Sequence, residues 1–184
     1  CLRNDIICTF MAKWNEKLPG SSGHTHQSLW RDGKPAFYDA SRPLNMSKTF
    51  EHYVAGVLET LPEMTALYAP TINSYRRLVP GLWAPTKACW APENRTGSLR
   101  TIHTPKPSSS RLELRVPGAD MNPYLAFAGT LAAGLWGVEN EVPLRPQVTG
   151  NAYRLPESEA PSLPATLEDA TSRFRSSKVA RELL

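Results

Sequence analysis

The chain has 184 residues, of which 41% are hydrophobic and 21% charged, as in a soluble globular protein with one sizeable core. Its net charge of +4, from 21 basic and 17 acidic residues, is too small to indicate a nucleic-acid-binding protein. No apolar run is long enough to cross a membrane, and three cysteines without metal-ligand spacing argue against a disulfide scaffold or a zinc site. We therefore expect a reducing, cytoplasmic setting, with no membrane and no nucleic-acid partner.

Apolar periodicity and turn residues predict strands and helices along the chain. In chain order we expect strands over 6–11 and 24–30, a turn at 31–34, a helix over 47–67, a loop over 70–85, strands over 87–90, 98–103 and 111–116, a helix over 122–138, a proline-rich connection over 140–165 and a helical pattern from 167 onward. The first strand and the helix over 122–138 are predicted to be buried, because both are largely apolar. Ser47 can cap the helix over 47–67, and Pro62 is predicted to kink or divide it.

Residues 111–116 read Arg-Leu-Glu-Leu-Arg-Val, which alternates charged and apolar side chains. On a strand, Arg111, Glu113 and Arg115 share one face, and the three aliphatic residues share the other. A carboxylate can bind a hard cation such as magnesium, and guanidinium groups bind phosphate or carboxylate oxygens. The charged face is thus a candidate phosphate-handling metal site, although an ordinary solvated Glu/Arg ladder has the same pattern.

His24 and His26 follow a loop rich in glycine and serine, and on a strand they share a face with Ser28. A neutral imidazole is a good metal ligand, and imidazole or hydroxyl groups can contact a nucleotide. The alternative is a pair of half-exposed strand histidines. The loop 20–23 could bring backbone amides close to a ligand, but it lacks the lysine and the spacing of a P-loop.

Arginines are concentrated in two further polar segments. Arg76 and Arg77 lie in Asn-Ser-Tyr-Arg-Arg-Leu-Val-Pro-Gly, and Arg95 and Arg100 lie in Asn-Arg-Thr-Gly-Ser-Leu-Arg. Such clustering suits a small polyanion as well as a solvent-exposed basic surface. Neither segment alone decides between these two interpretations.

The order of these segments is more informative than any one of them. His-x-His-x-Ser is followed by Asn-Ser-Tyr-Arg-Arg-Leu-Val-Pro-Gly, Asn-Arg-Thr, Arg-x-Glu-x-Arg and Asn-Pro-Tyr-Leu. This series resembles the catalytic domain of the type I glutamine synthetase superfamily, most strongly over residues 6–140.

The resemblance implies an α+β fold, in which a curved antiparallel β-sheet has helices packed on its outside. Residues 1–184 would be the C-terminal part of that catalytic domain, truncated at both ends, without the N-terminal β-grasp domain and the first part of the catalytic domain. Ring-shaped members of the family complete each active site with a neighbouring subunit. We therefore expect a homo-oligomeric ring for the full-length parent and no activity from this piece alone.

The resemblance also implies a ligase in which ATP, with Mg²⁺ or Mn²⁺, phosphorylates the side-chain carboxylate of glutamate before ammonia or another amine displaces the phosphate. The implied metal ligands are His24 and Glu113. The implied ATP-binding residues are His26, Ser28, Arg95 and Arg100. The implied substrate-binding residues are Gly20, Arg77, Trp83 and Arg115, and the implied catalytic residues are Arg77, Arg95 and Arg115.

Two positions depart from the family pattern. Pro19 replaces an amide side chain expected near the substrate's amino group, and Trp83 replaces a glutamate that shields the site and helps deprotonate ammonium in ammonia-using members. An indole is only a donor, but it can form an apolar or cation–π wall for a larger amine. We therefore predict a γ-glutamyl-amide ligase that uses an organic amine, such as a polyamine or alkanolamine. The alternative is a non-catalytic, structural member of the superfamily.

Overall fold

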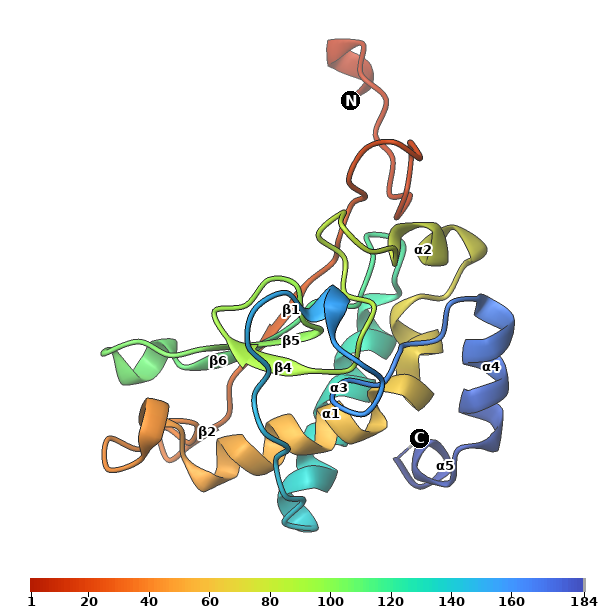
Figure 1. Ribbon diagram of the computed structural model, residues 1–184. Coiled ribbons are helices and arrows are strands. Elements are labelled where there is room, and N and C mark those ends of the chain that lie inside the picture. The colour runs from red at the N-terminus through yellow and green to blue at the C-terminus, as the bar shows by residue number, and fades with distance from the viewer. Residues whose placement is uncertain (184) are drawn as a thin grey trace.

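The computed structural model describes residues 1–183, in which a small β-sheet packs on a layer of helices (Figure 1). The sheet has four strands in the order β1-β6-β5-β4, and a separate ribbon pairs β2 with β3. The strands are β1 (Thr25–Gln27), β2 (Trp30–Arg31), β3 (Lys34–Pro35), β4 (Trp90–Pro92), β5 (Leu99–Ile102) and β6 (Arg111–Leu114). The helices are α1 (Lys48–Tyr68), α2 (Ile72–Arg77), α3 (Pro123–Glu139), α4 (Leu167–Ser176) and α5 (Lys178–Leu183), with the short turns η1 (Leu2–Asn4), η2 (Pro43–Asn45), η3 (Pro107–Ser109) and η4 (Ala152–Arg154). The predicted α+β class is confirmed.

One pair of strands differs from the expected antiparallel sheet. β6 is antiparallel to both β1 and β5, but β5 runs parallel to β4, with Leu99 opposite Trp90. Parallel neighbours usually need a long crossover. Here the loop 93–98 doubles back along β4, and Glu93 begins it in the left-handed region, at φ 51°. The sheet is therefore mixed rather than wholly antiparallel.

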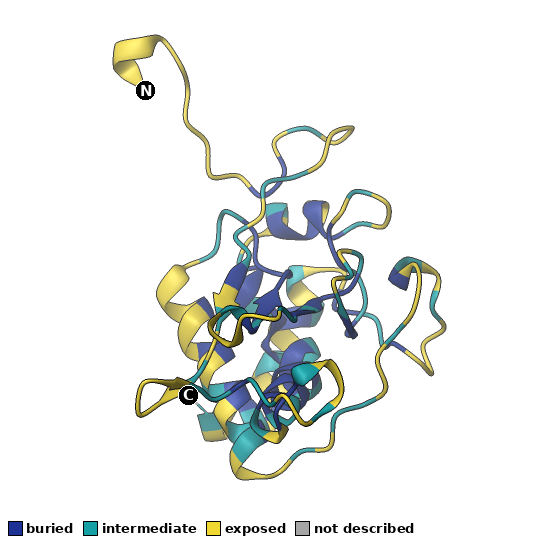
Figure 2. Cartoon of the chain, turned by 90° about the vertical axis from the view of Figure 1, so that its left-hand side faces the viewer, coloured by how far each residue is buried: buried dark blue, intermediate teal, exposed yellow. Residues whose placement is uncertain are grey.

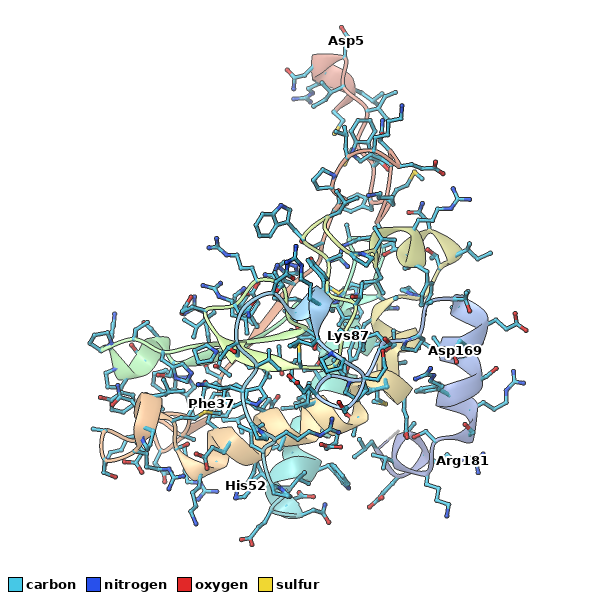
Figure 3. All side chains as sticks on the ribbon, viewed as in Figure 1. Asp5, Phe37, His52, Lys87, Asp169 and Arg181 are labelled. Carbon is cyan, nitrogen blue, oxygen red and sulfur yellow. The ribbon has the colours of Figure 1, made fainter. Side chains whose placement is uncertain are left out.

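The core lies between the sheet and the helices. Leu112 and Leu114 of β6 are each 1% exposed and belong to the same apolar cluster as the buried residues of α1 and α3. Phe37, labelled in Figure 3, stacks on Phe50 of α1, with ring centroids 4.2 Å apart. The aliphatic face of the strand over 111–116 is thus buried, as its pattern predicts.

The helix predicted over 47–67 is present as α1. The Ser47 side chain caps it by accepting a hydrogen bond from the Phe50 backbone N–H at 3.1 Å. The division predicted at Pro62 is wrong, because Pro62 lies inside one continuous helix. Proline removes one backbone donor, but the helix continues on both sides of Pro62, where it packs against α3 and α4.

Glycines allow α1 and α3 to approach closely. A Cβ atom on Gly56 would lie 2.3 Å from the Ala133 carbonyl oxygen and 2.6 Å from the Gly137 Cα atom. A Cβ atom on Gly134 would lie 2.2 Å from the Tyr53 ring. These distances are shorter than real contacts, so no larger residue fits without moving a helix.

Two predictions in the first half of the chain need correction. The segment 6–11 is an exposed coil rather than a buried strand, with Ile7 96% exposed, and it extends away from the domain (Figure 2). No strand among residues 1–183 pairs with it, so its backbone polar groups stay in solvent. The loop predicted over 70–85 contains α2, whose start is fixed by a reciprocal capping box between Thr71 and Ser74.

Helix α3 confirms the helix predicted over 122–138, but only one side of it is buried. Asn122 caps it by accepting from the backbone N–H of Tyr124, and small residues such as Ala133 face α1. Its other side exposes large apolar residues, namely Tyr124, Leu125, Phe127, Leu131 and Leu135. Within residues 1–183, no helix combines the length and apolarity needed to cross a membrane.

Candidate active site

The register of the sheet places three charged or polar residues in one row. His26 of β1 lies opposite Glu113 of β6, and Glu113 lies opposite Arg100 of β5. Residues directly opposite in neighbouring strands project to the same side of a sheet. The row is therefore on the face of the sheet away from the aliphatic side chains of β6.

Glu113 is the centre of this face. Its Oε1 atom accepts from Arg115 Nη1 at 2.6 Å and lies 3.0 Å from His24 Nδ1, while Oε2 accepts from Arg100 Nη1 at 2.9 Å. The Glu113 side chain is only 4% exposed. Burial by itself raises the pKa of this carboxyl, but hydrogen bonds from His24 and Arg100 and the charge of Arg115 hold it well below its usual range. Glu113 is therefore an ionised carboxylate in a nearly buried site.

A loop clamped to the strand brings His24 to Glu113. The Gly23 backbone N–H donates to the Pro117 carbonyl at 2.9 Å, and a Cβ atom on Gly23 would lie 2.7 Å from the Gly118 carbonyl oxygen. The glycine-rich sequence before His24 thus permits a close backbone approach just beyond Arg115. The His24 Nε2 atom is buried and has no hydrogen-bond partner among the described residues.

Arg77 lies directly behind this cluster. It is 3% exposed, and its guanidinium donates to the backbone carbonyls of Val116 at 2.7 Å and Arg115 at 3.0 Å. Burial, together with the charge of Arg115, lowers the pKa of Arg77 to about 10, so it remains charged at neutral pH. A Cβ atom on Gly20 would lie 2.9 Å from the Arg77 side chain. Gly20 and Arg77 thus form a packed pair that holds the backbone carrying Arg115.

Trp83 lies at the rim of the site. Its side chain is 62% exposed, and its backbone is in the left-handed region at φ 63°, next to Gly81 at φ 83°. Its carbonyl oxygen lies 3.4 Å from Arg115 Nη2. The backbone of Trp83 therefore contacts Arg115, while the Trp83 indole is available to a ligand.

The remaining predicted ATP-binding residues, Ser28 and Arg95, lie in exposed segments next to strands of the same sheet. Ser28 is exposed beyond β1, with its hydroxyl accepting from Trp30 Nε1 at 3.1 Å. Arg95 is exposed in the loop that follows β4. Together with His26 and Arg100, they come from strands or loops on both sides of β6.

The structure adds residues that the sequence pattern did not assign to the site. Arg111 donates from Nε to His26 Nδ1 at 3.2 Å, so an arginine to which the family resemblance gave no role is next to a predicted nucleotide residue. Glu93 pairs with Arg100 Nη2, which leaves Arg100 between two carboxylates. The period-two alternation of the strand does place Arg111 on the charged face, but no local pattern points to Glu93.

A family model of the glutamine synthetase catalytic domain matches residues 2–184. The chain belongs to the glutamine synthetase family. It is 45% identical over 183 residues to type-1 glutamine synthetase 2 of Dictyostelium discoideum, a match that covers 97% of this chain and 35% of that protein. The resemblance stated from the motifs is thereby confirmed.

Two other relatives carry names of amide ligases. Glutamate–isopropylamine ligase of a Pseudomonas species is 41% identical over 180 residues, covering 97% of this chain and 39% of that protein. Gamma-glutamylethanolamide synthetase of Streptomyces coelicolor is 44% identical over 174 residues, covering 94% of this chain and 36% of that protein. The chain thus spans little more than a third of the length of these relatives.

Glutamine synthetase family members are expected to bind a divalent cation, and the donors in this chain fit one in part. Glu113 is an ionised carboxylate, and His24 Nε2 is an unpaired, buried imidazole nitrogen. Carboxylate oxygens suit Mg²⁺ or Mn²⁺, and imidazole is acceptable to Mn²⁺. Within residues 1–183, no cluster of three or more His, Cys, Asp or Glu side chains is positioned to hold a metal ion. The described residues therefore supply two candidate ligands, and a bound cation would need further ligands from elsewhere.

Proposed function

We propose that the full-length protein containing this chain is an ATP-dependent ligase that forms γ-glutamyl amides from glutamate and an organic amine. The observation that carries the proposal is the convergence of His24, Arg100 and Arg115 on the buried Glu113 carboxylate, with Trp83 at the rim. Phosphoryl transfer depends mainly on charge neutralisation and alignment. The cluster supplies a cation-binding carboxylate and several guanidinium groups on one face, which supports that chemistry.

In this proposal His24 and Glu113 hold Mg²⁺ or Mn²⁺, with the missing ligands supplied by water, phosphate oxygens and residues outside the chain. A bound divalent cation would neutralise phosphate charge during transfer. Arg95 and Arg100 contact the phosphates of ATP, and His26 and Ser28 contact the nucleotide. Arg115 contacts the γ-carboxylate of glutamate, while Gly20 and Arg77 hold the substrate side of the site.

Trp83 is the residue that favours an organic amine over ammonia. Its exposed indole cannot act as the carboxylate base that ammonia-using members carry, but it can contact the carbon skeleton of a larger amine. The names of two relatives, which refer to isopropylamine and to γ-glutamylethanolamide, support an organic acceptor.

The test is glutamate-dependent ATP turnover by the full-length protein with ammonia and with a panel of alkylamines, alkanolamines and polyamines. We expect at least one organic amine to give a higher kcat/KM than ammonia. A Trp83→Glu variant should shift preference toward ammonia, whereas Trp83→Phe, which keeps an aromatic wall, should not. A preference for ammonia over every organic amine in the unmodified protein would contradict the choice of acceptor.

A non-catalytic, structural member of the family remains the second candidate. The observation that favours it is the loss of two substrate-facing residues, at Pro19 and Trp83. That protein would show no glutamate-dependent ATP turnover with any amine. Intact glutamate ligands in the sequence upstream of this chain would favour the enzyme, and their loss would favour the structural protein.

For the full-length protein we further propose a homo-oligomeric ring in the cytoplasm, and no activity from residues 1–184 alone. Cys1, Cys8 and Cys89 are all free, which suits a reducing compartment. Sedimentation of the full-length protein tests the ring. ATP turnover by the isolated chain tests the need for the missing parts.

A further inference from the structure

Glu93 pairs with Arg100, the arginine that we propose contacts a phosphate of ATP. It is the first residue after β4, on the side of that strand next to β5 (Figure 1). Its backbone N–H donates to the Thr101 carbonyl of β5 at 3.2 Å, and its carboxylate accepts from Arg100 Nη2. The other terminal nitrogen of Arg100, Nη1, donates to Glu113 at 2.9 Å. Both ends of the Arg100 guanidinium therefore face a carboxylate.

The two carboxylates differ in how firmly they are held. The Glu113 side chain is 4% exposed, accepts from Arg115 at 2.6 Å and lies 3.0 Å from His24. The Glu93 side chain is 53% exposed, and among the described residues its hydrogen-bond partner is Arg100. Because the Glu93 backbone is bonded to β5, its carboxylate can leave Arg100 by rotation about side-chain bonds, without a change in the strands. Glu93 is thus the exchangeable partner of Arg100.

The charges of this cluster depend on where the Glu93 carboxylate lies. Two guanidinium groups, of Arg100 and Arg115, face two carboxylates, of Glu93 and Glu113. These four charges balance while Glu93 contacts Arg100, and one net positive charge is exposed when Glu93 turns away. Phosphate oxygens bind the same guanidinium N–H groups as a carboxylate does. A phosphate is therefore repelled by Glu93 in the first arrangement and attracted to Arg100 in the second.

We infer that Glu93 sets the affinity of the site for nucleotide phosphates, because its carboxylate competes with them for Arg100 and turns away when a phosphate binds. This inference rests on the proposed function, because that function gives Arg100 a phosphate to bind. It assigns a role to the residue directly before the Asn-Arg-Thr motif. The sign of the effect is specific: a residue that only held Arg100 in place would strengthen phosphate binding, whereas a competitor weakens it.

The test uses Glu93→Gln in the full-length protein, which removes the charge and keeps the length of the side chain. Calorimetry measures the binding of ATP with Mg²⁺, without glutamate or amine, and the binding of adenosine. The charge of an exposed ion pair changes an equilibrium by up to roughly fivefold, so ATP should bind roughly 2- to 5-fold more tightly to the variant. The gain should shrink at high salt, because ions screen exposed charges. Adenosine has no phosphate and should bind equally to both proteins.

Glu157→Gln is the matched control. Glu157 pairs with Lys87, and their side chains are 65% and 12% exposed, close to the 53% and 16% of Glu93 and Arg100. The control removes the same charge from a pair that has no proposed contact with ATP, so ATP binding should not change. Equal tightening in both variants would overturn the inference, because it would reflect net charge alone. Unchanged or weaker ATP binding by Glu93→Gln would overturn it as well.

The outcomes separate this inference from the proposed function. If the unmodified protein forms γ-glutamyl amides and Glu93→Gln does not bind ATP more tightly, the inference is wrong and the ligase proposal stands. If the unmodified protein binds ATP but turns it over with no amine, the ligase proposal fails, and the binding difference still decides the role of Glu93. If neither protein binds ATP, both are overturned.

Discussion

Both faces of β6, extended by Arg115, carry buried side chains, but different forces stabilise them. Leu112 and Leu114 pack into the apolar core, whereas Glu113 and Arg115, at 3% and 5% exposed, are held by hydrogen bonds and opposite charges. Apolar burial has no preferred direction, while a buried ion pair needs both partners in place. The degree of burial therefore does not distinguish the apolar core from the candidate site. The site differs from the core in its arrangement of hydrogen-bond donors and acceptors.

The largest expected effect follows from removing the charge at the centre of the polar face. Glu113→Gln keeps the shape but leaves Arg115 without its buried partner, so we expect a loss of about 3–5 kcal/mol of unfolding free energy. If the proposed function holds, glutamate-dependent ATP turnover should also fall by roughly 10²- to 10³-fold. Denaturant unfolding and the turnover assay on the full-length protein measure the two losses.

Glu59→Gln is the matched control for that variant. Glu59 pairs with Arg145, but their side chains are 33% and 40% exposed. A surface pair contributes about 0–1 kcal/mol, because solvent screens the charges. Equal destabilisation by the two substitutions would show that the Glu113 pairs are no more important than surface pairs.

A substitution on the apolar face should change stability and leave binding alone. Leu114→Ala removes a side chain that is 1% exposed, and we expect a loss of about 2–5 kcal/mol in unfolding free energy from lost burial and the cavity left behind. The KM values for glutamate and ATP should stay the same. Leu18→Ala, at a side chain 44% exposed, should change stability by no more than about 0.5 kcal/mol. Altered KM values with unchanged stability would contradict this division between the faces.

The two faces should also differ in their response to acid. Because folding lowers the pKa of Glu113, its contribution to stability is fully present above the unfolded pKa of about 4.3 and declines as the pH falls from there toward the folded pKa. The stability difference between the unmodified protein and Glu113→Gln should therefore shrink on acidification. The difference for Leu114→Ala should not follow this carboxylate titration. Denaturant unfolding at a series of pH values from about 7 to about 3 measures both; a constant Glu113→Gln difference would exclude the ionised pair.

The smallest expected effect tests a polar contact on the core side of the sheet. Ser47→Ala removes the cap of α1, which should reduce the unfolding free energy by about 1 kcal/mol. Thr166→Ala removes the equivalent cap of α4, where Thr166 Oγ1 accepts from the exposed Asp169 N–H at 3.1 Å. Thermal unfolding of both variants compares the two caps. We expect the larger loss at Ser47, because Ser47 also donates to the Ala36 carbonyl at 2.6 Å. A larger loss at Thr166 would show that burial of the cap is unimportant.

The sequence correctly predicted those features that depend only on residues close together in the chain. The periodic helix capped by Ser47, the turn at 31–34 and the alternation around Glu113 are all present, because a cap, a turn and a two-residue period are set by local geometry. The ordered motifs also predicted the family, which the comparison over residues 2–184 confirms. The prediction of a strand over 6–11 is wrong, since strand formation needs a partner strand that the described residues do not provide.

By itself, then, the sequence determined the family, the main helices and the identity of the charged residues on β6. Only the tertiary structure decided that Glu113 and Arg115 are nearly buried and that Arg100 lies between Glu93 and Glu113. These relations depend on strand register and on the turn that follows β4. They are set by packing between distant segments, which no local pattern of residues encodes.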